Sequence, residues 1–95
     1  MRTIHKFAII DFDGVIPMPR NADILCVQMQ GSWPHIWALV DDETEKEDRR
    51  IVTVGTGWAV PDDLGRGDYI GTYQSGTLVW HVFAPKPNGV SSARA

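Results

Sequence analysis

The sequence predicts an all-β protein, a small antiparallel sandwich or barrel of about six or seven strands with a C-terminal hairpin. Three observations predict this class. Short runs rich in β-branched and aromatic residues recur along the 95 residues, and turn residues separate them. No segment shows a helical apolar stripe of useful length. A chain of this size forms one domain around a single hydrophobic core.

Five strands are expected before residue 57. Residues 24–30 alternate apolar and polar side chains, which is typical of a half-buried strand. The segment 11–14, Asp-Phe-Asp-Gly, lies between two apolar runs and favours a hairpin turn. Pro17 and Pro19 suit an edge or a strand exit, because proline cannot donate to a ladder. The predicted strands cover residues 4–10, 15–18, 24–30, 35–40 and 49–56.

The hairpin over residues 69–83 is the strongest fold signal. Two runs of β-branched and aromatic residues flank Ser75 and Gly76, and glycine readily adopts the positive φ that a two-residue turn needs. With these two residues as the loop, a glycine would lie opposite a tryptophan and leave room for its indole. The expected cross-strand pairs are Gln74 with Thr77, Tyr73 with Leu78, Gly71 with Trp80, and Tyr69 with Val82.

Domain limits and core follow from the same patterns. Trp37 and Trp80 lie inside predicted strands and are expected in the core, and Cys26 is expected to be a small buried apolar residue. Residues 1–83 are predicted to form the domain. Residues 84–95 offer nothing to bury and are predicted to be a flexible tail.

Composition limits the functional classes. The single Cys26 excludes an intramolecular disulfide and a cysteine-based zinc site, and the three histidines lack metal-ligand spacing. We therefore expect no metal and no cofactor. No apolar run approaches membrane-spanning length, and the N-terminus lacks the apolar core of a signal peptide. A soluble, cytoplasmic protein without membrane association is expected, and an exposed strand edge would permit homo-oligomers.

Charge is concentrated in one block. The net charge is −3, and residues 41–48 hold six acids and one lysine. Such a block is expected to be a solvated loop, or an acidic surface that meets a basic partner. The basic residues are scattered, which argues against direct DNA binding. The predicted partner-binding residues are Asp41, Asp42, Glu43, Glu45, Glu47 and Asp48, together with the turn aromatic Trp33.

A second hypothesis places a small ligand at the turns. The segment 55–57, Gly-Thr-Gly, shares its glycines with phosphate-binding loops but lacks the Lys-Ser/Thr that completes a P-loop. A bulge or strand end is the plainer interpretation. As a ligand site, its backbone N–H groups would meet a phosphate and an aromatic ring would stack on a base. The predicted ligand-binding residues are Gly55, Gly57, Trp58, Arg66 and Tyr73.

An enzymatic interpretation rests on residues 8–16, Ala-Ile-Ile-Asp-Phe-Asp-Gly-Val-Ile. They look like the first motif of haloacid-dehalogenase-type phosphotransferases. That resemblance implies a nucleophilic Asp11, an acid/base Asp13 and a Mg²⁺ ion. The fold of that family needs parallel strands with crossover helices of about thirty residues per unit. This chain lacks the helical periodicity, so we expect no enzyme and no catalytic residues.

Several stretches together resemble a family of small phage and prophage proteins of unassigned function. The resemblance spans residues 1–83 and brings no catalytic residues. It implies a non-enzymatic phage protein in the host cytoplasm that inhibits an antiviral defence, such as a CRISPR effector, by binding a host defence protein. The alternative is an oligomeric sponge that sequesters a nucleotide second messenger. The matching stretches are residues 1–7 MRTIHKF, 37–41 WALVD, 55–57 GTG, 68–74 DYIGTYQ and 78–83 LVWHVF.

Overall fold

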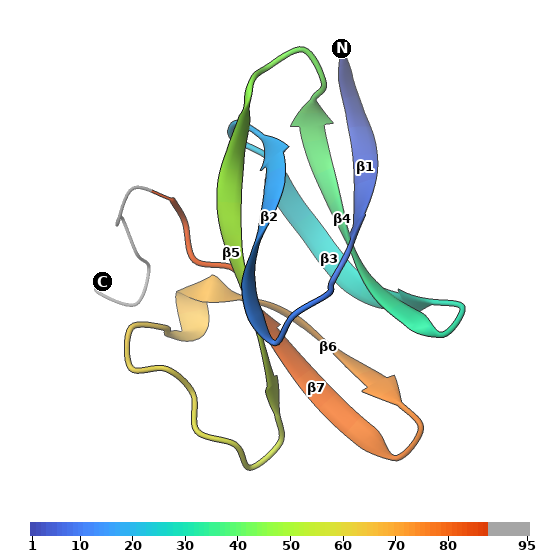
Figure 1. The fold of residues 1–95 in the computed structure, drawn as a ribbon, viewed down its shortest axis with the longest axis vertical. Helices are drawn as coiled ribbons and strands as arrows, with labels where there is room; N and C mark the ends of the chain where they lie inside the picture. The colour runs from blue at the N-terminus through green and yellow to red at the C-terminus, as the bar shows by residue number, and fades with distance from the viewer. Residues whose placement is uncertain (88–95) are drawn as a thin grey trace.

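The computed structural model describes residues 1–87, whose regular elements are seven strands and one short 3-10 helix (Figure 1). This confirms the predicted all-β class, and the predicted tail over residues 88–95 lies outside the described residues. Within residues 1–87 no helix is long and apolar enough to cross a membrane. The elements are β1 Arg2–Ala8, β2 Asp13–Pro19, β3 Asp23–Gln30, β4 Trp33–Asp41, β5 Lys46–Gly55, the 3-10 helix η1 Arg66–Asp68, β6 Tyr69–Ser75 and β7 Leu78–Phe83.

The strands form two antiparallel sheets that pack as a sandwich. One sheet has the order β1-β4-β3 and the other the order β2-β5-β7-β6. Strand β5 is the longest and serves two neighbours, because its first half pairs with β2 and its last residues pair with β7. In Figure 1 the β3–β4 and β6–β7 hairpins end on the same side of the molecule.

The predicted hairpin turn at residues 11–14 is wrong. Strand β1 pairs with β4 and strand β2 pairs with β5, so the two strands belong to different sheets. Residues 9–12, called the crossing below, lead from one sheet to the other. Backbone hydrogen bonds hold both ends of the crossing in place. The Ile9 amide donates to the Pro34 carbonyl oxygen at 3.1 Å, and the Thr53 amide donates to the Phe12 carbonyl oxygen at 2.7 Å.

The core lies between the inner faces of the two sheets. Along β4 the alternation buries Ile36, Ala38 and Val40, and leaves the odd-numbered residues on the outer face. Trp37 is therefore half-buried on the outer face, and its predicted core position is wrong. Cys26 pairs with Trp37 across β3 and β4 and is likewise half-buried.

The β6–β7 hairpin has the predicted strands but a different register. Ser75 pairs with Leu78, so the two loop residues are Gly76 and Thr77 and not Ser75 and Gly76. Gly76 has φ +62°, and a positive φ at the first loop position alone is the requirement of a type II′ turn. The shift places Tyr73 opposite Trp80 on the inner face.

Gly71 therefore makes room for a different neighbour than predicted. It pairs with Val82 and not with Trp80, and a Cβ atom at this position would lie 2.8 Å from Cγ1 of Val27. The bare backbone of β6 thus lets β3 of the other sheet approach closely. The glycine serves the packing of one sheet on the other.

Gly71→Ala is expected to lower the free energy of unfolding by about 1–3 kcal/mol, because the new methyl group overpacks the contact with Val27. Chemical denaturation measures this change. The cost should largely vanish in a Val27→Ala background, since the smaller side chain vacates the space. An equal cost in both backgrounds would contradict the proposed contact.

A second, smaller apolar cluster covers the outer face of β5. The segment between β5 and η1 folds back so that Leu64 packs on Val52 and Val54, with Phe83 beside them. Ala84, assigned to the tail from sequence, is buried and its amide donates to the Asp68 carbonyl oxygen at 2.8 Å. The packed part of the chain therefore extends beyond residue 83.

Candidate functional site

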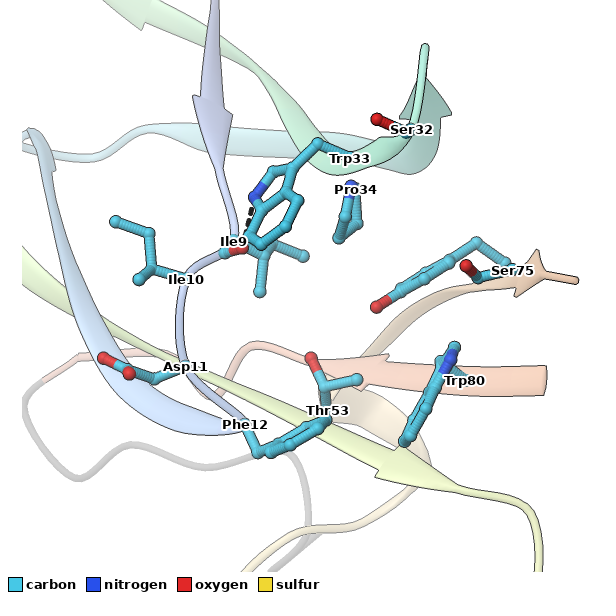
Figure 2. A pocket seen from close by; sticks show the side chains of 11 residues that line it. Ile9, Ile10, Asp11, Phe12, Ser32, Trp33, Pro34, Thr53, Ser75 and Trp80 are labelled. Atoms are coloured by element: carbon cyan, nitrogen blue, oxygen red, sulfur yellow. Dashed lines mark hydrogen bonds between the residues drawn. The ribbon is translucent and has the colours of Figure 1, made fainter. Parts of the chain in front are cut away.

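An aromatic cleft opens between the two sheets, on the side where the β3–β4 and β6–β7 hairpins end (Figure 2). Its volume is about 220 Å³. Three parts of the chain line it: the crossing between β1 and β2, the start of β4, and the inner face of β5, β6 and β7. The aromatic side chains that line it are Phe12, Trp33, Tyr73 and Trp80.

The lower wall of the cleft is an aromatic cluster. The rings of Phe12 and Trp80 lie 5.3 Å apart between centroids and are tilted by 32°. Trp58 meets both rings edge-on, at 5.5 Å from Phe12 and 5.2 Å from Trp80. Edge-to-face pairs of this kind stabilise by about 0.5–1.5 kcal/mol beyond their buried area. Even so, Phe12 and Trp58 remain 57% and 53% exposed.

Glycine at the end of β5 allows this cluster to form. A Cβ atom on Gly55 would lie 2.9 Å from Cε2 of Trp58, so only glycine lets the indole lie against the strand. Gly57 has φ +91°, which turns the chain back on itself. The amides of Thr56 and Trp58 donate to Val79 and Gly55 carbonyl oxygens. Those two N–H groups are thus engaged within the turn that the sequence suggested for phosphate binding.

The opposite wall is Trp33, held in a fixed orientation. Its indole Nε1 donates to the Ile9 carbonyl oxygen at 2.8 Å, a bond drawn in Figure 2. Trp33 remains 50% exposed. The bond to the crossing segment turns the ring toward the cleft although Trp33 belongs to the outward-facing set of β4.

The back of the cleft carries a buried hydroxyl. Thr53 is only 4% exposed, and within residues 1–87 its Oγ1 has no hydrogen-bond partner. Figure 2 shows this side chain pointing into the space between Trp33 and the Phe12–Trp80 wall. A buried polar atom without a partner costs about 1–3 kcal/mol, so a ligand atom that bonds to it would recover that free energy. Burial also raises the pKa of the Tyr73 phenol.

The charge around the cleft is negative. Asp11 is the one charged side chain among the described residues that line it. Its carboxylate turns from the interior toward Gly14, where a Cβ atom would lie 3.0 Å from Oδ2 (Figure 2). The volume is below the roughly 300–1,000 Å³ of sites for drug-sized ligands. The cleft therefore suits one small planar group that is neutral or positively charged.

The structure brings some predicted site residues together and separates others. Trp33, predicted to bind a partner, shares the cleft with Tyr73, predicted to bind a ligand, and Trp58 extends its lower wall. The acidic block lies at the other end of β4, roughly 26 Å from Trp33 at 3.3 Å per residue. Arg66 lies on η1 and does not line the cleft.

The acidic block divides into a hairpin turn and a strand. Glu47 and Asp48 belong to β5 and pair with β2. Asp41 and Asp42 bond to the N-terminal amine at 3.2 and 3.0 Å, and Glu45 pairs with Arg20. The pKa of Asp41 is lowered, first by the backbone hydrogen bond from Glu43 and then by the amine.

Asp13, the second carboxylate of the phosphotransferase-like motif, is engaged in an ion-pair network. Arg50 bonds to Asp13 at 3.0 Å and to Asp63 at 2.6 Å, which ties the segment after β5 to β2. The hydrogen bond from Arg50 lowers the pKa of Asp13. Within residues 1–87 no group of three or more His, Cys, Asp and Glu side chains is placed to hold a metal ion.

Asp13→Asn is expected to make the free energy of unfolding less sensitive to a fall in pH. Because the folded pKa of Asp13 lies below its ordinary 3.8, its contribution is complete above that value and is lost as pH falls through the folded pKa. The exposed position limits the loss at pH 7 to about 0.2–1 kcal/mol. Urea denaturation between about pH 2 and 7 measures both effects. Asp62→Asn, an exposed neighbour, is the control, and equal acid slopes in both variants would contradict this role.

One of the three histidines, His81, links neighbouring parts of its sheet. His81 lies on the outer face of β7, and its Nε2 bonds with Thr56 Oγ1 at 2.7 Å. Its Nδ1 bonds with Thr72 Oγ1 at 3.0 Å. The ring therefore bridges β6 and the turn after β5, on the side of the sheet away from the cleft.

Sequence reasoning missed most residues of the cleft, among them three on which its shape and chemistry depend. Phe12 was assigned to a turn, Trp80 to the core, and Thr53 to the interior of a strand. The position of Phe12 in a polar turn could have indicated its role, because an aromatic residue there needs a packing partner. Nothing in the sequence distinguishes Thr53, because its importance comes from a buried hydroxyl that has no hydrogen-bond partner within residues 1–87.

These features define an all-β sandwich whose two sheets enclose an aromatic cleft with an acidic rim. The chain belongs to the DUF7352 family, described as a domain of unknown function, whose model matches residues 1–92. The comparisons found no match among curated proteins or solved structures.

Proposed function

We propose that this is a non-enzymatic binding protein that attaches to a partner protein through the aromatic cleft. The resemblance to phage proteins supports a partner from a bacterial antiviral defence, which the protein would inhibit by occupying it. The observation that carries the proposal is the exposed aromatic surface at the mouth of the cleft. Trp33, Trp58 and Phe12 are each about half exposed, at 50–57%.

The residue types at the cleft support protein binding. Tryptophan and tyrosine dominate the energetics of protein interfaces, where they sit in well-packed pockets surrounded by polar residues. A contiguous apolar patch on a soluble domain commonly marks a binding surface. Here the cluster is stabilised by its own ring contacts and by the Trp33 bond to Ile9. The surface is therefore preformed, which limits the entropy lost on binding.

The acidic hairpin would have a supporting role. Glu43 and Glu45 are its most exposed acids with side chains 82% and 72% accessible, and Glu45 already pairs with Arg20. Charges at the rim of an interface mainly raise the association rate with an oppositely charged partner. The hairpin lies at the far end of β4 from Trp33, so it would touch a large partner only outside the cleft.

A nucleotide sponge is the second candidate. The approach of Trp58 to Trp80 favours it, because Gly55, Trp58 and Trp80 also line an open hollow of about 430 Å³ beside the cleft. A base could stack there. Among the described residues, no lysine, arginine or histidine lines that hollow or the cleft, so residues 1–87 offer a phosphate group no counter-charge there. Protein binding is therefore the better-supported function.

A phage challenge tests the proposal. Bacterial strains that each carry one defence system would express the wild type, Trp33→Ala, or the exposed control Leu25→Ala. The wild type and the control should restore plaque formation in one strain, and Trp33→Ala should not. Isothermal titration with the purified defence protein should then show about a thirtyfold weaker affinity for Trp33→Ala, as expected for a hot-spot residue.

Two outcomes would overturn this assignment. Equal affinity of wild type and Trp33→Ala for the partner would exclude the cleft as the binding surface. A nucleotide that co-purifies with the wild type in native mass spectrometry, and that Trp58→Ala loses, would establish the sponge in its place. Circular dichroism confirms that each variant is folded before the comparison is made.

A further inference from the structure

We propose that the cleft is a receptor for the guanidinium group of an arginine side chain that projects from the partner protein. This inference rests on the proposed function and names the chemistry of the contact. It combines three properties of the cleft: aromatic walls, a buried hydroxyl without a hydrogen-bond partner within residues 1–87, and a negative charge at the rim.

The aromatic walls favour a flat cation. Trp33 forms one wall and the Phe12–Trp80 pair the other, with the mouth open between the two hairpins (Figure 2). The face of an aromatic ring carries negative electrostatic potential and attracts cations, most strongly in tryptophan. Guanidinium is planar and weakly hydrated, so it stacks on such faces and leaves water more readily than an ammonium group.

The back of the cleft offers an acceptor for the N–H groups of guanidinium. Thr53 Oγ1 is buried, has no partner within residues 1–87 and points into the cleft. The hydroxyls of Ser32, Tyr73 and Ser75 belong to the same lining. Arginine carries five donors in one plane, which matches a narrow slot with several hydroxyl oxygens around it.

The charges select a cation over an anion. Asp11 adds negative charge at the rim, and its carboxylate points away from the interior of the cleft. It would therefore attract a bound cation by its charge and not by a direct hydrogen bond. Arg50, on the same strand as Thr53, is bound by Asp13 and Asp63. It therefore presents little repulsion to an incoming cation. For a phosphate or carboxylate, Asp11 would be the one charged side chain among the described residues of the lining, and it would repel the anion.

The test is a titration of the intact protein with capped amino acids, followed by tryptophan fluorescence and amide NMR shifts. N-acetyl-arginine methylamide is the probe, and the citrulline, lysine and adenosine analogues are the comparisons. Citrulline keeps the shape of arginine and removes its charge. The arginine probe should bind at least about tenfold more tightly than each comparison, because guanidinium alone combines charge with planarity.

Matched variants locate the contact. Trp33→Ala should weaken arginine binding by about tenfold, and Asp11→Asn by about threefold, since the latter removes only a nearby charge. Thr53→Val keeps the shape of the side chain, removes the unpaired hydroxyl, and should weaken binding by about tenfold without lowering the melting temperature. Asp62→Asn, an exposed acid elsewhere, should bind as the wild type does.

The outcomes separate this inference from the proposed function. Equal binding of arginine and citrulline, or tighter binding of lysine or adenosine, would overturn the guanidinium assignment. If the purified partner still loses affinity for Trp33→Ala in that case, the cleft remains the protein-binding surface with a different occupant. If the arginine probe binds as expected, replacing single surface arginines of the partner by lysine should identify the one that enters.

Discussion

Ile36→Ala is expected to lower the free energy of unfolding by about 2–5 kcal/mol, among the largest effects of any single substitution in this protein. Ile36 is completely buried, at 0% exposure, in the middle of the central strand of its sheet. It pairs with Phe7 on one side and with Val27 on the other, so its removal leaves a cavity that neither strand can close. The total free energy of unfolding of a domain of this size is only about 5–15 kcal/mol.

Chemical denaturation with an unchanged m-value measures this loss. Leu25→Ala is the matched control, because Leu25 is an exposed leucine on β3 of the same sheet. It should change stability by less than about 0.5 kcal/mol. A loss below about 1 kcal/mol in Ile36→Ala would show that the two sheets do not pack over this residue.

Trp80→Ala is expected to lower the free energy of unfolding by about 3 kcal/mol and to abolish binding at the cleft. Trp80 is half-buried and holds both Phe12 and Trp58 by ring contacts, so its loss removes the lower wall as a unit. It also faces Tyr73 across the β6–β7 pair. Denaturation measures the stability, and titration with the arginine probe measures the binding.

Leu78→Ala provides the control for Trp80. Leu78 occupies the same face of β7 two residues earlier and is exposed, so its truncation should cost less than about 0.5 kcal/mol and preserve binding. Trp80→Phe separates the loss of stability from the loss of binding, because its smaller ring restores part of the packing that Trp80→Ala removes. Retained binding in Trp80→Ala would contradict the arrangement of the cleft.

The strands could be predicted because each obeys a local rule. Residues 24–30 alternate as a half-buried strand does, and β3 occupies Asp23–Gln30. The hairpin 69–83 was predicted with its faces correct for Gly71, Tyr73 and Trp80, since its true register differs by an even step. Its pairs were wrong because glycine fits either loop position, and only the turn type decides between them.

The cleft could not be assembled from sequence because its parts meet only through pairing between distant strands. The segment 11–14 has the composition of a turn, but β1 and β2 each pair with a strand 27 to 39 residues further along the chain and therefore belong to separate sheets. That separation makes Phe12 a wall of the cleft. Trp33 was recognised as a turn aromatic, while its bond to Ile9 depends on the same crossing.

The interleaving of the two sheets has a consequence for a severed chain. The hairpin after β4 is the only link between residues 1–41, which hold β1 to β4, and the later strands among those described. Yet β2 lies in the sheet of those later strands, paired along its full length with β5. A cut in this exposed hairpin would leave two pieces that share a sheet, and neither piece could bury its apolar face alone. The halves should therefore reassociate when mixed, as in a split-protein reporter.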